Sequence, residues 1–165
     1  MKTSKKILIV DDDIDVINIV KTILDNQGYT VLTANNKTEG LKKAKEEKPD
    51  LAILDVMMSS HFEGFELAEE LTKSEEFKNM PVLMQTSIEV LETNDPDVIG
   101  LAKSYRANTE NKDLDVLLIE EKKTGKAGID YRNENGIAIW LPVDGFIRKP
   151  VKAKVLIESI EKFLQ

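Results

Sequence analysis

The sequence predicts an α/β domain in which five parallel strands form one sheet with helices on both faces. Short, wholly apolar runs alternate along the chain with stretches whose apolar residues recur at helical spacing. A parallel strand that is covered on both faces has no polar side, so it appears as a continuous apolar run. Alternation of such runs with amphipathic helices is typical of a doubly wound sheet.

Each predicted element follows from this pattern and from the residues at its ends. Strands are expected at 6–10, at 29–34, at 51–54, from 81 onward and at 145–147. Helices are expected from 14 to a stop at Gly28, at 38–47 before Pro49, at 65–77 and at 151–164. The 165 residues are enough for one domain with a sizeable core, and they include no cysteine.

Residues 88–144 are expected to be an insertion within a single domain that spans 1–165. A whole strand–helix–strand unit takes about 30 residues, so this stretch is longer than one crossover requires. Asp95 is expected to cap an inserted helix that has Pro96 at its first position. Short strands at 116–119, 129–131 and 137–140, with a turn at 133–136, predict a small hairpin or meander. We expect the insertion to fold, with Trp140, the only tryptophan, as an anchor that packs against the main domain.

Polar residues stand where the predicted strands end. Asp11 and Asp12 follow the first strand, Asp55 the third, Thr86 the fourth and Lys149 the fifth. In open α/β sheets, ligands bind beyond the carboxyl ends of the strands. Taken singly, each residue could be a helix cap, a strand terminus or a surface charge. Together they bring acids, a hydroxyl and an ammonium to one edge of the sheet.

Phosphoryl transfer to a carboxylate is the chemistry that fits these groups. Clustered acids repel each other and bind a hard cation such as Mg²⁺ through oxygen. Asp55 stands alone on the central strand and is the candidate nucleophile, which leaves Asp11 and Asp12 as the metal site. A metal, a hydroxyl and an ammonium can then hold the three equatorial oxygens of the transferred group. The neighbouring Asp13 is expected only to cap the following helix.

With these residues in these places, the chain resembles the response-regulator receiver family of two-component signalling, which includes single-domain chemotaxis regulators. The resemblance covers 5–87 and 144–165 and rests on four motifs: ILIVDDD at 7–13, DLAILDVMM at 50–58, PVLMQTS at 81–87 and FIRKP at 146–150. It implies a flavodoxin-like receiver fold that carries the insertion between its fourth and fifth strands. It also implies that Asp55 is the phosphoacceptor and that Asp11 and Asp12 hold Mg²⁺, together with the backbone carbonyl of Met57.

The resemblance implies further roles in the last two motifs. Thr86 and Lys149 would contact the phosphoryl oxygens, and Phe146 would change rotamer together with Thr86 on activation. The Lys149–Pro150 bond would be a cis peptide. One departure is the loop 58–64, which lacks the family's usual Met-Pro-Gly and contains His61, the only histidine. We expect His61 to be an ordinary loop residue.

The expected function is a phosphorylation-controlled signalling module with no enzymatic activity beyond self-catalysed phosphoryl acceptance and slow autodephosphorylation. A histidine kinase or a phosphotransfer protein would be the donor, and an unknown downstream protein would receive the signal. The last helix ends at 164–165, so no DNA-binding tail is expected, and the formal charge of −7 disfavours nucleic acid. No apolar run approaches the roughly 20 residues of a membrane span, so we expect a cytoplasmic protein. Homodimer formation stays open.

Two other functions remain as alternatives. A degenerate receiver would use the same fold as a scaffold that is never phosphorylated. A haloacid-dehalogenase-like phosphatase would use Asp11 and Asp13 as its Asp-x-Asp pair, but Asp15 stands where such enzymes have a hydroxyl residue. The sequence also has no strand after Lys149 that ends in an acidic pair, which the phosphatase reading requires.

Overall fold

The structure is a computed structural model that describes residues 4–56, 58, 63–107, 116–133 and 135–164. Its internal contacts divide the chain into two compact units. The first unit consists of 1–87 and 147–165, and the second of 88–146. The second unit therefore interrupts the first in sequence, after the fourth strand of the main sheet.

The main sheet has five parallel strands in the order β2-β1-β3-β4-β9, which confirms the predicted fold class. The strands are β1 (Lys6–Val10), β2 (Thr30–Ala34), β3 (Leu51–Asp55), β4 (Val82–Thr86) and β9 (Gly145–Arg148). In register, Ile9 of β1 lies between Thr33 of β2 and Ile53 of β3. Every residue of β3 and β4 is buried, which explains the nearly continuous apolar sequence of both strands.

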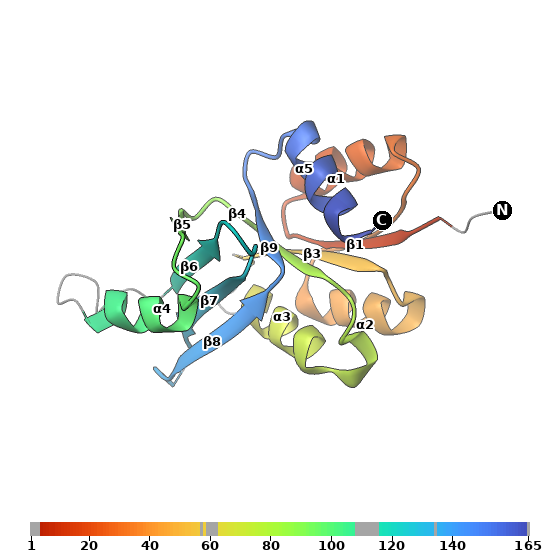
Figure 1. Cartoon of the computed structure of the whole chain (residues 1–165). Coiled ribbons are helices and arrows are strands. Elements are labelled where there is room, and N and C mark those ends of the chain that lie inside the picture. Colours follow the sequence, from red (N-terminus) through yellow and green to blue (C-terminus); the bar gives the residue numbers. More distant parts are fainter. Residues whose placement is uncertain (1–3, 57, 59–62, 108–115, 134, 165) are drawn as a thin grey trace. The chain divides into compact units, whose positions relative to one another are not determined.

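Helices cover both faces of this sheet, α1 and α5 on one face and α2 and α3 on the other (Figure 1). The helices are α1 (Ile14–Asn26), α2 (Lys37–Glu47), α3 (Glu63–Lys73) and α5 (Ala153–Phe163). Helix α3 ends earlier than predicted, and a short 3-10 turn, η1 (Glu75–Phe77), follows it. The reason is local, because the Ser74 hydroxyl accepts a hydrogen bond from the Glu76 amide and caps that turn.

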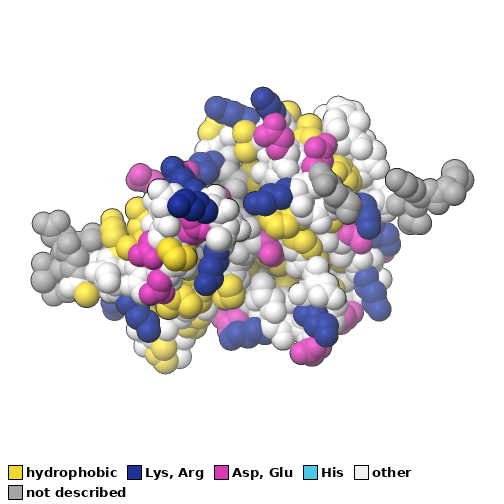
Figure 2. All heavy atoms as spheres, in the orientation of Figure 1, with side chains coloured by type: hydrophobic (Ala, Val, Ile, Leu, Met, Phe, Trp, Pro, Cys, Tyr) yellow, Lys and Arg dark blue, Asp and Glu magenta, His cyan; other side chains and the backbone are white. Residues whose placement is uncertain are grey.

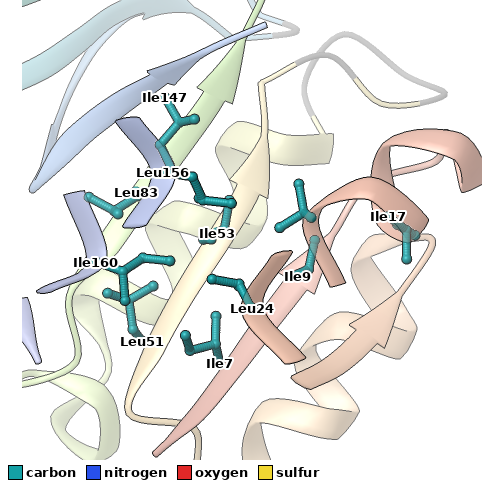
Figure 3. Close-up of a cluster of buried hydrophobic side chains, with 11 residues drawn as sticks. Ile7, Ile9, Ile17, Leu24, Leu51, Ile53, Leu83, Ile147, Leu156 and Ile160 are labelled. Carbon is teal, nitrogen blue, oxygen red and sulfur yellow. The ribbon is translucent and has the colours of Figure 1, made fainter. Parts of the chain in front are cut away.

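The core on the α1–α5 face fixes the strands against each other (Figure 3). Its buried side chains come from the sheet and from both helices: Ile7, Ile9, Leu51, Ile53, Leu83, Ile147, Ile17, Val20, Leu24, Leu156 and Ile160. Each fully buried Leu or Ile contributes about 1.5–3 kcal/mol relative to an exposed one. The residues that follow these strands are therefore held in place by a packed layer beneath them.

The second unit contains a four-stranded sheet and one helix. The strands are β5 (Val90–Thr93), β6 (Val116–Glu121), β7 (Ala127–Arg132) and β8 (Ala138–Val143), in the order β5-β6-β7-β8. Strand β5, which was not predicted, pairs with β6 in parallel, and β6, β7 and β8 form the expected antiparallel meander. The predicted turn between β7 and β8 is confirmed, since the Asn133 amide donates to Ile137 O and Gly136 has a φ of 76°.

Helix α4 (Val98–Ala107) begins two residues later than predicted. The Asp97 Oδ1 atom accepts a hydrogen bond of 2.9 Å from the Gly100 amide, so Asp97 and not Asp95 caps the helix. Asp95 forms the turn before it, by accepting from the Asp97 amide. Pro96 therefore lies outside the helix.

Helix α4 packs on one face of the second sheet. The cluster between them consists of Val98, Ala102, Leu117 and Ile119, with Leu91, Leu101, Tyr105 and Trp140 packed against it. Arg106 also joins α4 to β7, because its Nε atom lies 2.8 Å from Asp130 Oδ1 with both side chains largely buried. Trp140 thus helps to anchor the insertion's own core.

Gly128 of β7 lies directly under the Trp140 ring, and a Cβ atom there would come far inside van der Waals contact with the indole. We expect Gly128→Ala to displace the indole, to lower the free energy of unfolding by about 1–3 kcal/mol and to shift Trp140 fluorescence to the red. Gly136→Ala is the control, because it meets no neighbour and introduces only the strain of a positive φ. An unchanged emission spectrum in Gly128→Ala would contradict the prediction.

The surface carries charges of both signs. On the face shown in Figure 2, Lys and Arg side chains are interspersed with Asp and Glu. Within the part of the chain that the structure describes, none of the helices has the length and apolar character needed to cross a membrane.

Candidate functional site

The residues predicted at the strand ends lie at one edge of the main sheet. Asp11 directly follows β1, Asp55 and Thr86 are the last residues of β3 and β4, and Lys149 directly follows β9. Backbone hydrogen bonds extend the sheet to these positions: the Asp11 amide donates to Ala34 O at 3.1 Å, and the Lys149 amide donates to Thr86 O at 2.8 Å. The parallel strands therefore bring together residues that are far apart in sequence.

Lys149 connects the two buried carboxylates of this edge. Its Nζ atom lies 3.0 Å from Asp11 Oδ2 and 3.2 Å from Asp55 Oδ1. Burial lowers the pKa of Lys149, but the hydrogen bond to Asp11 and the negative charge of Asp55 outweigh that effect, so the pKa is raised. The ammonium group therefore stays charged at neutral pH and compensates two acids whose side chains are 0% and 4% exposed.

A third carboxylate completes an acidic cluster that fits a magnesium ion. Oxygen atoms of Asp11, Asp12 and Asp55 lie within 4.8 Å of one another, and Asp12 is the exposed member. Mg²⁺ binds oxygen ligands at about 2.0–2.1 Å, so two ligands on opposite sides of the ion are about 4.2 Å apart. The largest spacing in the cluster is therefore close to the largest that two ligands of one ion can have. Asp13 is not part of the cluster: it caps α1 by accepting from the Asp15 amide, as predicted.

The start of α3 packs directly against the backbone of Asp55. A Cβ atom on Gly64 would overlap Asp55 O and would lie 2.9 Å from Val56 O. The adjacent Glu63 carboxylate accepts a hydrogen bond of 2.7 Å from the Lys37 amide, which ties α3 to the start of α2. Gly64 was not among the residues predicted from the sequence. The available signal was a glycine at the start of a helix, which fits a close approach of backbone but also an ordinary helix cap.

A second residue that was not predicted is Gln85, which precedes Thr86 in β4. Its Nε2 atom donates to Asp11 Oδ2 at 3.2 Å, the same oxygen that Lys149 contacts. The signal in the sequence was an amide within an otherwise apolar strand.

Thr86 and Phe146 are both buried, the latter in β9. The Lys149–Pro150 bond is cis, as the resemblance implied.

Two residues named from the sequence, Met57 and His61, lie outside the residues that the structure describes.

The fold is that of a receiver domain, and so is the edge of the sheet where Lys149 lies beside the three carboxylates. The family model of the "response regulator receiver domain" matches residues 7–95, which are more than half of the chain. The chain therefore belongs to the response regulator receiver family, whose members are signalling modules of two-component systems that are phosphorylated on an aspartate. This membership favours neither the scaffold nor the phosphatase alternative.

Curated relatives match about half of the chain. The alkaline phosphatase synthesis transcriptional regulatory protein PhoP of Bacillus subtilis is 40% identical over 84 residues, which are 51% of this chain and 34% of that protein. Protein PilH of Pseudomonas aeruginosa is 35% identical over 82 residues, which are 50% of this chain and 67% of PilH. The chain thus spans about a third of the length of the transcriptional regulators that it matches.

Solved structures are similar over nearly the whole chain. A CheY-like receiver domain protein from Methanospirillum hungatei has a TM-score of 0.60 and 27% identity, covering 97% of this chain and 93% of that one. The chemotaxis response regulator CheY4 of Vibrio cholerae has a TM-score of 0.63 at 23% identity, covering 98% of this chain and all of CheY4. The likeness to CheY4 shows the fold.

Proposed function

We propose that this chain accepts a phosphoryl group on Asp55 and signals through contact with another protein. The observation that carries the proposal is the position of the Lys149 ammonium between Asp55 and Asp11, beside a cluster of three carboxylates. Acceptance of an anionic group by a carboxylate requires neutralising positive charge at the acceptor. Lys149 supplies one such charge, and a bound Mg²⁺ would supply the remainder.

The transfer itself needs a nucleophile and groups that hold the phosphoryl oxygens. With phosphohistidine as donor, a carboxylate oxygen of Asp55 forms a bond to phosphorus. The phosphorus–nitrogen bond breaks, and the imidazole keeps the electron pair and takes up a proton. Lys149 and the Thr86 hydroxyl bind the oxygens of the transferred group. The proposed donor is a histidine kinase or a phosphotransfer protein in the cytoplasm.

The proposed metal site consists of Asp11, Asp12 and Asp55, with the backbone carbonyl of Met57. When bound by these residues, Mg²⁺ would neutralise charge on the phosphoryl oxygens. Hard carboxylate oxygens are the ligands that this ion prefers, and their spacing supports the assignment.

We propose that the state of the site is passed on through Thr86 and Phe146, whose rotamers would change together. In this proposal 1–165 act as one receiver domain, and 88–144 form an insertion whose surface would take part in recognising the downstream protein. Neither nucleic acid nor a membrane is a proposed partner.

The test is labelling with acetyl phosphate and Mg²⁺, followed by intact-mass measurement. The wild-type protein is expected to gain one phosphoryl group that is lost in base, and Asp55→Asn is expected to gain none. Asp25→Asn is the matched control, because it removes an exposed carboxylate on α1 that pairs only with Lys21 among the described residues. Undiminished labelling of Asp55→Asn would overturn the proposal, and so would labelling that persists in excess EDTA.

A further inference from the structure

Gln85 is a fully buried amide in the interior of the main sheet. Its exposed fraction is 0%, and it lies opposite Asp55 in the register of β4 and β3. Because β4 lies between β3 and β9, neither edge of the strand faces solvent. An apolar side chain is the ordinary occupant of such a position.

The orientation of this amide follows from its partner. An ionised carboxylate only accepts hydrogen bonds, so the NH₂ group of Gln85 must face Asp11 Oδ2, at 3.2 Å. The Oε1 atom is then left buried without a hydrogen-bond partner among the described residues. The two heteroatoms of an amide are at most about 2.6 Å apart. Gln85 Oε1 therefore lies within roughly 6 Å of Asp11 Oδ2, next to the acidic cluster.

A buried acceptor without a partner destabilises the fold that contains it. A methionine of nearly the same shape would fill the position without that penalty. Asp11 also does not depend on Gln85 for compensation, because Lys149 contacts the same oxygen and the Asp13 amide donates to Oδ1 at 2.9 Å. Stability alone therefore does not explain an amide at this position.

We propose that Gln85 is a positioning residue for the magnesium site. Its Nε2 atom fixes the carboxylate plane of Asp11 from inside the sheet, and its Oε1 atom is the acceptor for a water molecule that enters with the metal. Mg²⁺ usually keeps several of its waters in proteins, and each of them needs an acceptor. This inference rests on the proposed function, since it assigns a residue to the metal site named there.

The test is Mg²⁺ titration of the full chain by calorimetry, for the wild type and for Gln85→Met. Groups that orient metal ligands typically contribute 10–100-fold in affinity, so we expect the dissociation constant to rise about tenfold. The melting temperature without Mg²⁺ is expected to be no lower than that of the wild type, because the variant removes the unpartnered acceptor. Leu83→Met is the control for repacking: it changes the same strand in the core and removes no polar contact.

The two measurements together separate positioning from packing. Unchanged Mg²⁺ affinity in Gln85→Met would overturn the inference. A variant with weaker Mg²⁺ affinity and also a lower melting temperature without Mg²⁺ would indicate a repacking defect and would overturn the inference too. Absence of Mg²⁺ binding by the wild type would have the same consequence. A third outcome is that the wild type binds Mg²⁺ more tightly than Gln85→Met but takes no phosphoryl group on Asp55. That outcome would refute the proposed function and leave the role of Gln85 intact.

Discussion

Replacing Lys149 by methionine is expected to lower the free energy of unfolding by about 3 kcal/mol at neutral pH without Mg²⁺, and to abolish phosphoryl acceptance. The variant leaves Asp11 and Asp55 buried with no ammonium between them. Because uncompensated buried charge is the cause, saturating Mg²⁺ should restore more stability to this variant than it adds to the wild type.

Urea unfolding of the two proteins, with and without Mg²⁺, measures these differences. The pKa of Lys149 is raised above its ordinary 10.5, so its stabilising contribution is present in full below that pH. It is lost only as the pH rises through the higher pKa of the folded state. The difference between wild type and variant should therefore stay constant from pH 7 to 9. Lys154→Met, at an exposed position of α5, is the control. Equal stability of Lys149→Met and wild type would show that the ion pairs do not form in solution.

Gly64→Ala is expected to destabilise the protein by about 3 kcal/mol or more and to impair phosphoryl acceptance on Asp55. The added Cβ atom meets the carbonyl oxygens of Asp55 and Val56, and backbone atoms cannot rotate away as a side chain can. The start of α3 and the end of β3 must then separate, which displaces Asp55.

The matched control is Gly28→Ala, which adds the same methyl group to the first unit. Gly28 has a φ of 86° and no neighbour within 4 Å of the new atom, so only conformational strain of about 1 kcal/mol is expected. Chemical denaturation gives the loss of stability, and acetyl phosphate labelling gives the loss of acceptance. A Gly64→Ala variant that labels at the wild-type rate would show that α3 can shift without moving Asp55.

The main sheet could be predicted from the sequence because its strands are buried on both faces. Residues 7–10 of β1 and 51–54 of β3 are buried and apolar, and Asp11 and Asp55 follow them directly, so strand and site appear in one pattern. The second sheet is harder to predict. Strand β5 is short and contains Glu92, so it shows neither an apolar run nor a clear alternation.

Gly64 and Gln85 could not be predicted because their importance depends on contacts across the fold. The sequence shows a glycine and a glutamine, but not that one lies against Asp55 O or that the other faces Asp11. Similarly, Asp95 and Asp97 both precede an apolar helix and are chemically identical. Only the hydrogen bond from the Gly100 amide shows which of them is the cap.

The place of the insertion in the sequence has a consequence for biosynthesis. Lys149 is 94 residues from Asp55, and a ribosome adds about 5–20 residues each second. The nascent chain therefore carries Asp55 for roughly 5–20 seconds, and Asp11 for longer, before the lysine that compensates them exists. For roughly 3–12 seconds of that time, between the synthesis of Thr86 and that of Gly145, β4 lacks its neighbour β9. One side of that strand is then an open edge, which is where nascent β-proteins associate wrongly. The insertion thus lengthens the period in which this protein is most exposed to misassembly and to capture by chaperones.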